Sequence, residues 1–201
     1  MTSARPPSQS PRRPTPLMRA SHLLSNVGAL GSLGAQAAAQ IREQAATPIA
    51  EIERSIRTAW LPLQLDIELT DAIETAVGRE RMRDLAREAI AVSAEGPLLG
   101  PFVRALHAVG LSPHAAFRVA PKAWKGVYRY CGELEVERTG EREVTITQRE
   151  APAEILESDS YAHGIAAEFE GVVLIAGGRE PRASMERVAV HRRIRYLCGW
   201  R

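Results

Sequence analysis

The sequence predicts an α+β fold, in which an N-terminal layer of helices packs on a four-stranded antiparallel sheet. Two observations support this. From Tyr128 to Glu137 and from Arg193 to Arg201, polar and apolar residues alternate, which is typical of strands with one buried and one exposed face. Before residue 124, apolar residues instead recur at helical spacing. The expected order is helices first, then β-β-α-β-β.

Length and composition predict one domain preceded by a tail. The chain has 201 residues, enough for one ordinary core. Residues 1–16 hold prolines among serine, threonine and arginine, which predicts disorder. Residues 17–201 are expected to form a single domain, helical over about 17–124 and built around the sheet over about 125–201.

The helical layer is predicted from apolar stripes that are bounded by glycine or proline. Proline is favoured in the first turn of a helix and glycine just after its end, so these residues mark boundaries. The predicted helical segments are 17–46, 48–60, 69–78, 82–92, 101–110 and 112–121.

Two hairpins that flank one helix are predicted for the sheet. The first joins a strand over 127–137 to a strand around Val144 and Ile146, and the second joins strands over 185–190 and 194–200. The helix over 158–176 carries an apolar stripe that would cross the buried face. The residues expected to point inward are Tyr128, Tyr130, Gly132, Leu134, Val136, Ile194, Tyr196, Cys198 and Trp200.

Charge and cysteine content exclude several classes of protein. The formal net charge is +2, from 26 basic and 24 acidic side chains, so no specific nucleic-acid binding is expected. No apolar run reaches the length of a membrane span. Cys131 is predicted to face water and Cys198 the core, so no disulfide joins them, and a cytoplasmic location fits.

The outer face of the sheet is predicted to carry paired charges. Arg193, Arg195 and Arg201 alternate with apolar residues in the last strand, and the first strand presents glutamates in the same way. Cross-strand pairing of these charges is expected. The glutamates are Glu133, Glu135 and Glu137.

Aromatic side chains gather where the sheet would meet the crossing helix. Such residues line pockets for flat apolar ligands, and they also fill ordinary cores, so both roles are open. The candidate ligand-binding residues are Trp124, Tyr128, Tyr130, Phe169, Tyr196 and Trp200. Gly164 and Gly171 lie on one face of the same helix and are candidates for an interface, either with the sheet or with a second subunit.

No catalytic or metal-binding motif is present in the sequence. Ser158, Asp159 and His163 could form a hydrolytic set, but a triad is defined by geometry, and Ser158 or Asp159 is expected to cap a helix instead. No two histidines have a recurrent ligand spacing, so no metal site is predicted. The five histidines are His22, His107, His114, His163 and His191.

A few residues resemble a known ligand-binding fold. They are the segment SPHAAFRVAPKAW over Ser112–Trp124, the spacing from Gly164 to Gly171, and a final strand that closes on Trp200. The chain from Ala20 to Arg201 resembles 4-vinyl-reductase-type domains, haem nitric-oxide-binding domains and the small subunits of Golgi tethering complexes. It is most similar to an uncharacterised myxobacterial family of that fold.

The resemblance implies a pocket for an apolar molecule between helices and sheet, and frequent dimerisation. By resemblance, His107 or His114 lies in the region that could ligate haem. The chain departs from these families in two ways, because it has only Cys198 where a cysteine cluster is usual and it lacks a Tyr-x-Ser-x-Arg motif. No cofactor, and in particular no haem, is therefore expected.

The leading functional hypothesis is a noncatalytic sensor or regulatory module that binds an apolar small molecule or an acyl chain between helices and sheet. The alternative is a structural or protein-interaction module with a filled core, which assembles into a homo-oligomer, such as a homodimer, or a hetero-oligomer. An enzyme of tetrapyrrole metabolism is a third possibility, by analogy alone. The identity of the ligand, the partner and the assembly size do not follow from the sequence.

Overall fold

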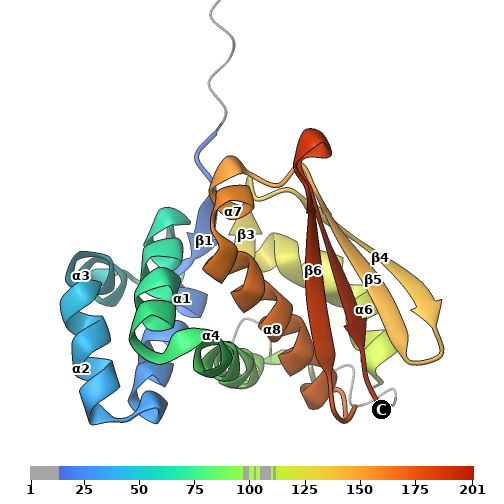
Figure 1. The fold of residues 1–201 in the computed structure, drawn as a ribbon, viewed down its shortest axis with the longest axis horizontal. Coiled ribbons are helices and arrows are strands. Elements are labelled where there is room, and N and C mark those ends of the chain that lie inside the picture. The colour runs from blue at the N-terminus through green and yellow to red at the C-terminus, as the bar shows by residue number, and fades with distance from the viewer. Residues whose placement is uncertain (1–13, 97–99, 102, 105–109, 111) are drawn as a thin grey trace, which may run out of the picture.

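A computed structural model of the chain describes residues 14–96, 100, 101, 103, 104, 110 and 112–201. Most of the predicted tail, and most of the predicted segment 101–110 with His107, therefore lie outside the described residues. The described part confirms the predicted α+β class, with helices first and strands last. Figure 1 shows the main sheet edge-on at one side, the helix α8 (Asp159–Ile175) against it, and the N-terminal helices on the far side of α8.

The helical layer surrounds one long helix. The helices are α1 (Ala20–Ala29), the 3₁₀ turn η1 (Leu30–Leu33), α2 (Ala35–Gln44), α3 (Ala46–Arg54) and α4 (Gln64–Glu95). Gly34 has a φ of 93°, a conformation that glycine adopts freely, and it divides the segment predicted as 17–46. Gly78, with a φ of 78°, interrupts α4 where a helix end is predicted, but the helix resumes after a kink.

A small sheet joins distant parts of the chain. Its central strand β1 (Leu17–Arg19) pairs antiparallel with β2 (Trp60–Pro62) and β3 (Tyr128–Arg129). Trp60 therefore belongs to a strand, and the helix predicted to end there stops at Arg54. On the outer face, the guanidinium groups of Arg19 and Arg129 lie 3.8 and 4.1 Å from the centre of the Trp60 ring, which stabilises this sheet by cation–π attraction.

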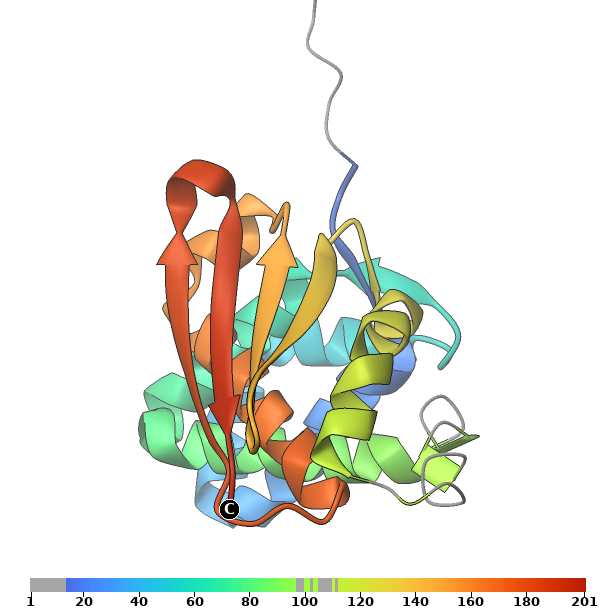
Figure 2. The same cartoon turned by 90° about the vertical axis from the view of Figure 1, so that its right-hand side faces the viewer.

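The main sheet has four antiparallel strands in the order β4-β5-β7-β6. They are β4 (Glu133–Gly140), β5 (Glu143–Arg149), β6 (Arg182–Val188) and β7 (Arg193–Gly199), and a short 3₁₀ turn, η2 (Ala189–His191), joins the last two. In register, Ile146 lies opposite both Val136 and Tyr196 on the inner face. Figure 2 looks onto this sheet, with the N-terminal helices behind it.

The helices α6 (Pro113–Val127), α7 (Ala153–Glu157) and α8 (Asp159–Ile175) complete the fold. Ser158 caps α8, as predicted, because its hydroxyl accepts a hydrogen bond of 3.2 Å from the Tyr161 amide. The prediction that Pro121 ends its helix is wrong, since α6 continues to Val127. Burial of Phe117, Trp124 and Val127 outweighs the hydrogen bond that proline cannot make.

The prediction of one continuous strand over 127–137 is also wrong. Tyr130 and Gly132 have φ values of 58° and 80°, and the chain passes there from the small sheet to the main sheet. Tyr130, predicted to point inward, is therefore 58% exposed, and Cys131, predicted to face water, is buried. Cys198 is buried, as predicted, and both thiols are free.

The predicted pairing of glutamates in the first strand with arginines in the last is corrected by the strand order. The strand β5 lies between β4 and β7, so those side chains are not direct cross-strand neighbours. Instead Glu135 pairs with Arg149 at 2.5 Å and Glu133 with Lys125 at 2.9 Å. Arg201 pairs with Glu180 at 2.8 Å.

Candidate functional site

A cavity of about 130 Å³ lies between α4, α6 and α8, next to β3 and β4. Its wall is apolar, with residues from each of these helices, among them Ile90, Ala116, Ala120, Phe169 and Val172. Three polar residues interrupt this wall: His22, Tyr128 and Glu168. We call this space the apolar cavity.

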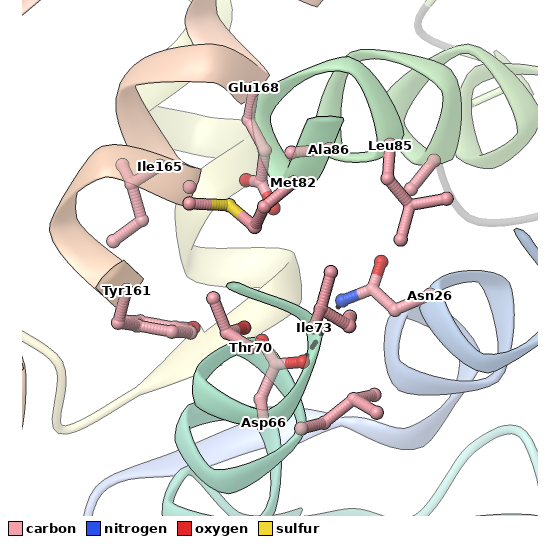
Figure 3. A pocket seen from close by; sticks show the side chains of 13 residues that line it. Asn26, Asp66, Thr70, Ile73, Met82, Leu85, Ala86, Tyr161, Ile165 and Glu168 are labelled. Atoms are coloured by element: carbon pink, nitrogen blue, oxygen red, sulfur yellow. Dashed lines mark hydrogen bonds between the residues drawn. The ribbon is translucent and has the colours of Figure 1, made fainter. Parts of the chain in front are cut away.

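A second, smaller cavity of about 30 Å³ lies on the other side of Glu168. Asn26, Asp66, Thr70 and Tyr161 line it together with apolar residues of α4 and α8 (Figure 3). Its volume suffices for a water molecule, and its polar groups are of the kind that hold one. We call this space the polar cavity, and Glu168 lines both.

The polar residues reach the interior because helical spacing places them on buried faces. His22 and Asn26 are four residues apart on α1, and Tyr161 and Glu168 are seven apart on α8, so each pair lies on one face of its helix. Asp66 stands in the first turn of α4. Side chains from α1, α4 and α8, which are far apart in the sequence, thus form one buried polar cluster.

Three hydrogen bonds join these side chains into one group of three and one pair. His22 Nε2 lies 3.2 Å from a carboxylate oxygen of Glu168, and His22 Nδ1 lies 3.4 Å from the hydroxyl of Ser93. Asn26 Nδ2 donates to Asp66 Oδ1 at 3.0 Å, the contact drawn as a dashed line in Figure 3. Both nitrogens of the His22 ring are therefore engaged.

One buried polar atom of this region, Oδ1 of Asn26, lacks a hydrogen-bond partner among the described residues, and Asn26 lines the polar cavity. The buried hydroxyl of Tyr128 has the Tyr161 hydroxyl as its hydrogen-bonding neighbour. Buried polar groups are nearly always hydrogen-bonded in native proteins, and an orphaned one calls for a water molecule or a ligand.

Burial and mutual charge change the acidity of the cluster. Burial raises the pKa of Asp66 to about 6, against the attraction of His22 and the hydrogen bond from Asn26. Burial opposes protonation of His22, but the charge of Glu168, its hydrogen bond and the charge of Asp66 together raise the pKa of the imidazole above its ordinary value. The protonated form of His22 is therefore favoured by its contact with Glu168.

The phenol of Tyr128 stays protonated. Burial, then the negative charges of Glu168 and Asp66, raise its pKa well above the ordinary value. Its ring stacks on Trp124 with centroids 3.8 Å apart, and the Trp124 indole N–H donates to the Gly132 carbonyl at 3.1 Å. The ring of Tyr128 is therefore held in place at the cavity wall.

The structure brings only part of the predicted ligand-binding set together. Tyr128 and Phe169 line the apolar cavity. Trp124 stacks on the ring of Tyr128, and Tyr196 packs edge-on against Phe169 with ring centroids 5.2 Å apart.

Trp200 and Tyr130 lie elsewhere. Trp200 packs between His114 and Phe117, with ring centroids 4.9 and 6.1 Å away. Tyr130 stands exposed in the loop between the two sheets, so its predicted place in the pocket is corrected.

The two candidate interface glycines of α8 face α4 of the same chain. A Cβ on Gly164 would meet Thr70 and Met82 at 3.7 and 3.8 Å, and a Cβ on Gly171 would meet the Arg87 carbonyl at 3.1 Å. Both are buried, so they serve the packing of α8 on α4.

Although the sequence holds a signal for two of them, four polar residues of the site were not predicted from the sequence: His22, Asn26, Asp66 and Glu168. Glu168 stands three residues after Ile165 in the apolar stripe of its helix, and Asp66 stands three before Leu69. A carboxylate inside an apolar stripe is unusual, because Asp and Glu are rarely buried without a partner. For His22 and Asn26 the polar partners come from other elements, which the sequence does not place.

The other histidines have surface or structural roles where they are described. His114 Nε2 contacts the Glu141 carbonyl at 2.7 Å, outside both cavities, and burial lowers the pKa of His163. Over the described ranges, no three His, Cys, Asp or Glu side chains gather in a metal-binding cluster. In the same ranges, no helix has both the length and the apolar character needed to cross a bilayer.

Comparison with solved structures identifies the fold. One structure, from a study of haem distortion in the H-NOX family, superposes with a TM-score of 0.63 at 11% identity, over 92% of this chain and 95% of that one. An oxygen-binding H-NOX domain related to soluble guanylate cyclases gives 0.61 at 11%, over 92% and 95%. The unliganded Fe(II) H-NOX protein of K. algicida gives 0.60 at 10%, over 92% and 97%. No protein-family model and no curated sequence matches.

These likenesses show the H-NOX fold, one of those that the sequence resembles. They do not bear on the resemblance to 4-vinyl-reductase-type domains or to the myxobacterial family, which stays a prediction. They correct the prediction on cofactors, since the structures that share this fold are described as haem and Fe(II) proteins. The expectation of no cofactor, and of no haem, is therefore wrong, and haem becomes a candidate.

Proposed function

We propose that the chain is a noncatalytic sensor or regulatory module that holds an apolar small molecule in the apolar cavity. One observation carries the proposal: an apolar space between α4, α6 and α8, whose described wall is interrupted by no polar residue other than His22, Tyr128 and Glu168. A volume of about 130 Å³ is close to that of an engineered cavity of about 150 Å³ that binds benzene. The alternative, an interaction module with a filled core, does not account for this space.

Haem is the first ligand to test, because solved structures that share this fold are described as haem proteins. The residues of the cavity wall include two donor types that hold haem iron in other proteins, the imidazole of His22 and the phenol oxygen of Tyr128. Both His22 nitrogens are engaged and the Tyr128 phenol stays protonated beside Tyr161, so either group must give up a present interaction before it ligates iron. When bound, haem would supply an iron that takes a small ligand at its free position. Ligand pockets usually span about 300–1,000 Å³, so a macrocycle requires α4, α6 and α8 to separate.

Titration of the purified protein with hemin tests this ligand directly. Stoichiometric binding would give a sharpened Soret band, and Tyr128→Phe or His22→Leu would shift that band if the residue ligates the iron. Tyr196→Phe, which changes a phenol outside the cavity, should leave the spectrum unchanged. A spectrum equal to that of free hemin would remove haem from the proposal.

Native mass spectrometry before and after organic extraction tests the proposal more broadly. We expect an extractable apolar mass on the purified protein. Ala116→Leu adds a larger side chain to the cavity wall, so it should abolish the bound mass while raising the free energy of unfolding by about 1 kcal/mol. Protein that never carries or accepts an apolar molecule would contradict the proposal.

A homodimer in the cytoplasm is part of the same proposal. Light scattering after size-exclusion chromatography measures the assembly size, and twice the mass of 22.0 kDa is expected.

A further inference from the structure

The outer face of the small sheet combines positive charge with apolar surface. In the strands β1, β2 and β3, every second residue is half-buried or exposed, and the residues between them are buried. The residues that share the outer face are Leu17, Arg19, Trp60, Pro62 and Arg129. Two basic and three apolar side chains therefore lie together on one surface.

The two arginines of this face lie close together without a counter-ion. Their guanidinium carbons are 3.8 and 4.1 Å from the centre of the Trp60 ring, so the two charges are within about 8 Å of each other, the Debye length at physiological salt. Within the described ranges, neither arginine forms an ion pair. Burial and then the charge of Arg129 lower the pKa of Arg19, and no carboxylate counteracts them.

This group of side chains offers hydrogen-bond donors and lacks an acceptor. Arg19 donates one N–H to the Thr58 carbonyl at 2.7 Å, whereas Arg129 and the indole N–H of Trp60 have no hydrogen-bond partner in the part of the chain that the structure describes. Guanidinium groups bind carboxylates through two parallel hydrogen bonds, and such charge-assisted bonds are the stronger kind. A carboxylate is therefore the natural partner of this face.

A protein segment fits the face better than a small anion does. A small anion would contact the charged groups and leave Leu17 and Pro62 in water, whereas a peptide covers both kinds of surface. Trp and Arg are also the residue types that contribute most to protein interfaces. Alternate residues of an extended segment lie roughly 7 Å apart on one side, a spacing compatible with that of the two arginines.

Two other occupants fit the charges less well. A two-fold dimer formed through this face would set the same basic residues of both copies against each other, and like charges in contact are unfavourable. Nucleic acid calls for a wide basic surface, whereas the formal net charge of this chain is only +2.

We propose that the outer face of the small sheet docks an acidic, extended segment of a partner protein, whose carboxylates bond to Arg19 and Arg129 and whose apolar side chains cover Leu17 and Pro62. This interaction surface is separate from the apolar cavity. The inference therefore does not depend on the ligand proposed for that cavity.

Selection of peptides from an unbiased random library, displayed on phage, tests the chemistry of the partner. We expect peptides selected on the immobilised full-length chain to be enriched in Asp and Glu at alternate positions, and the enrichment to disappear on Arg129→Gln. Arg193→Gln is the matched control, because Arg193 is also an exposed arginine of a strand but belongs to the main sheet. It should select the same peptides as the wild type.

Fluorescence anisotropy of a labelled selected peptide then tests the ion pair itself. Arg129→Gln should weaken binding roughly fivefold, the upper range for one surface ion pair. Arg129→Glu should prefer a peptide in which one acidic residue is replaced by lysine. This exchange of preference requires a folded variant, so it separates lost contact from lost folding.

The remaining outcomes overturn the proposal. Selected peptides without acidic enrichment, or equal binding to wild type and Arg129→Gln, would show that the face does not recognise carboxylates. A change of mass in light scattering on Arg129→Gln would make the face an interface between copies of this chain. Displacement of the peptide by an equal concentration of single-stranded DNA would assign the face to nucleic acid instead.

Discussion

Asp66 shows how a single buried carboxylate makes stability depend on pH. Its pKa is about 6 in the folded chain and near 4 when unfolded, so the folded chain binds the extra proton between these values. The free energy of unfolding therefore falls as the pH rises through this window, and the cost of ionising Asp66 is complete above it. The raised pKa of His22 acts in the same direction, since that contribution is lost as the pH rises through the folded value.

Asp66→Asn should remove the cost of this ionisation. We expect the variant to be more stable than the wild type by roughly 3 kcal/mol at pH 8, and the difference to vanish near pH 4. Asparagine can still accept the hydrogen bond from Asn26. Urea unfolding across this pH range measures the effect, and Asp84→Asn, an exposed carboxylate, is the control. A pH-independent difference would show that Asp66 ionises normally.

Tyr130 and Tyr196 occupied equivalent places in the predicted sheet, yet they differ in the structure. Tyr196 is fully buried against Phe169, so Tyr196→Ala should lower the free energy of unfolding by about 3–5 kcal/mol. Tyr130 is exposed, so Tyr130→Ala should lower it by less than about 1 kcal/mol. Thermal and urea unfolding of the two variants compare these losses, and similar values would contradict the placement of Tyr130. Alternation predicted a strand correctly on either side of this position, but it cannot reveal a residue with positive φ.

At the scale of elements, the sequence predicts the long helices and the four main strands, because each buries a whole periodic face. The small sheet escaped prediction because its strands have two or three residues, too few for alternation to be recognised. The polar lining of the cavities escaped for a related reason. It assembles from α1, α4, α8 and β3, and spacing within one element does not reveal its partners.

The two glycines of α8 give a prediction for one helix–helix contact. At Gly164 an added Cβ makes ordinary contacts, so Gly164→Ala should be neutral or should stabilise by up to about 1 kcal/mol through helix propensity. At Gly171 the Cβ would press on the Arg87 carbonyl and on Ile90, so Gly171→Ala should destabilise by about 1–3 kcal/mol. Chemical denaturation compares the two, and the reverse order would place α8 differently on α4.

At the scale of the whole molecule, Glu170 ties the helical layer to the sheet. Its buried carboxylate binds Arg83, Arg87 at 2.5 Å and the Ala183 amide at 2.7 Å, so it connects α8 with α4 and β6. Loss of its charge would leave Arg83 buried without a counter-ion. Such losses cost about 3–5 kcal/mol.

Glu170→Gln should therefore unfold at a clearly lower urea concentration than the wild type. Glu180→Gln, which removes half of an exposed pair with Arg201, is the control and should change the free energy of unfolding by less than about 0.5 kcal/mol. If both variants behaved alike, the α4–α8–β6 connection would not be what holds the layers together.

The two buried cysteines can serve as probes of internal motion in this chain. Burial raises the pKa of both thiols to about 12, so neither reacts with an alkylating reagent while it is enclosed. Cys131 follows the small sheet and Cys198 belongs to β7, so modification of each marks the opening of a different region. The two labelling rates, followed by mass spectrometry with and without a bound compound, would show whether binding slows the opening of one of these regions or of both.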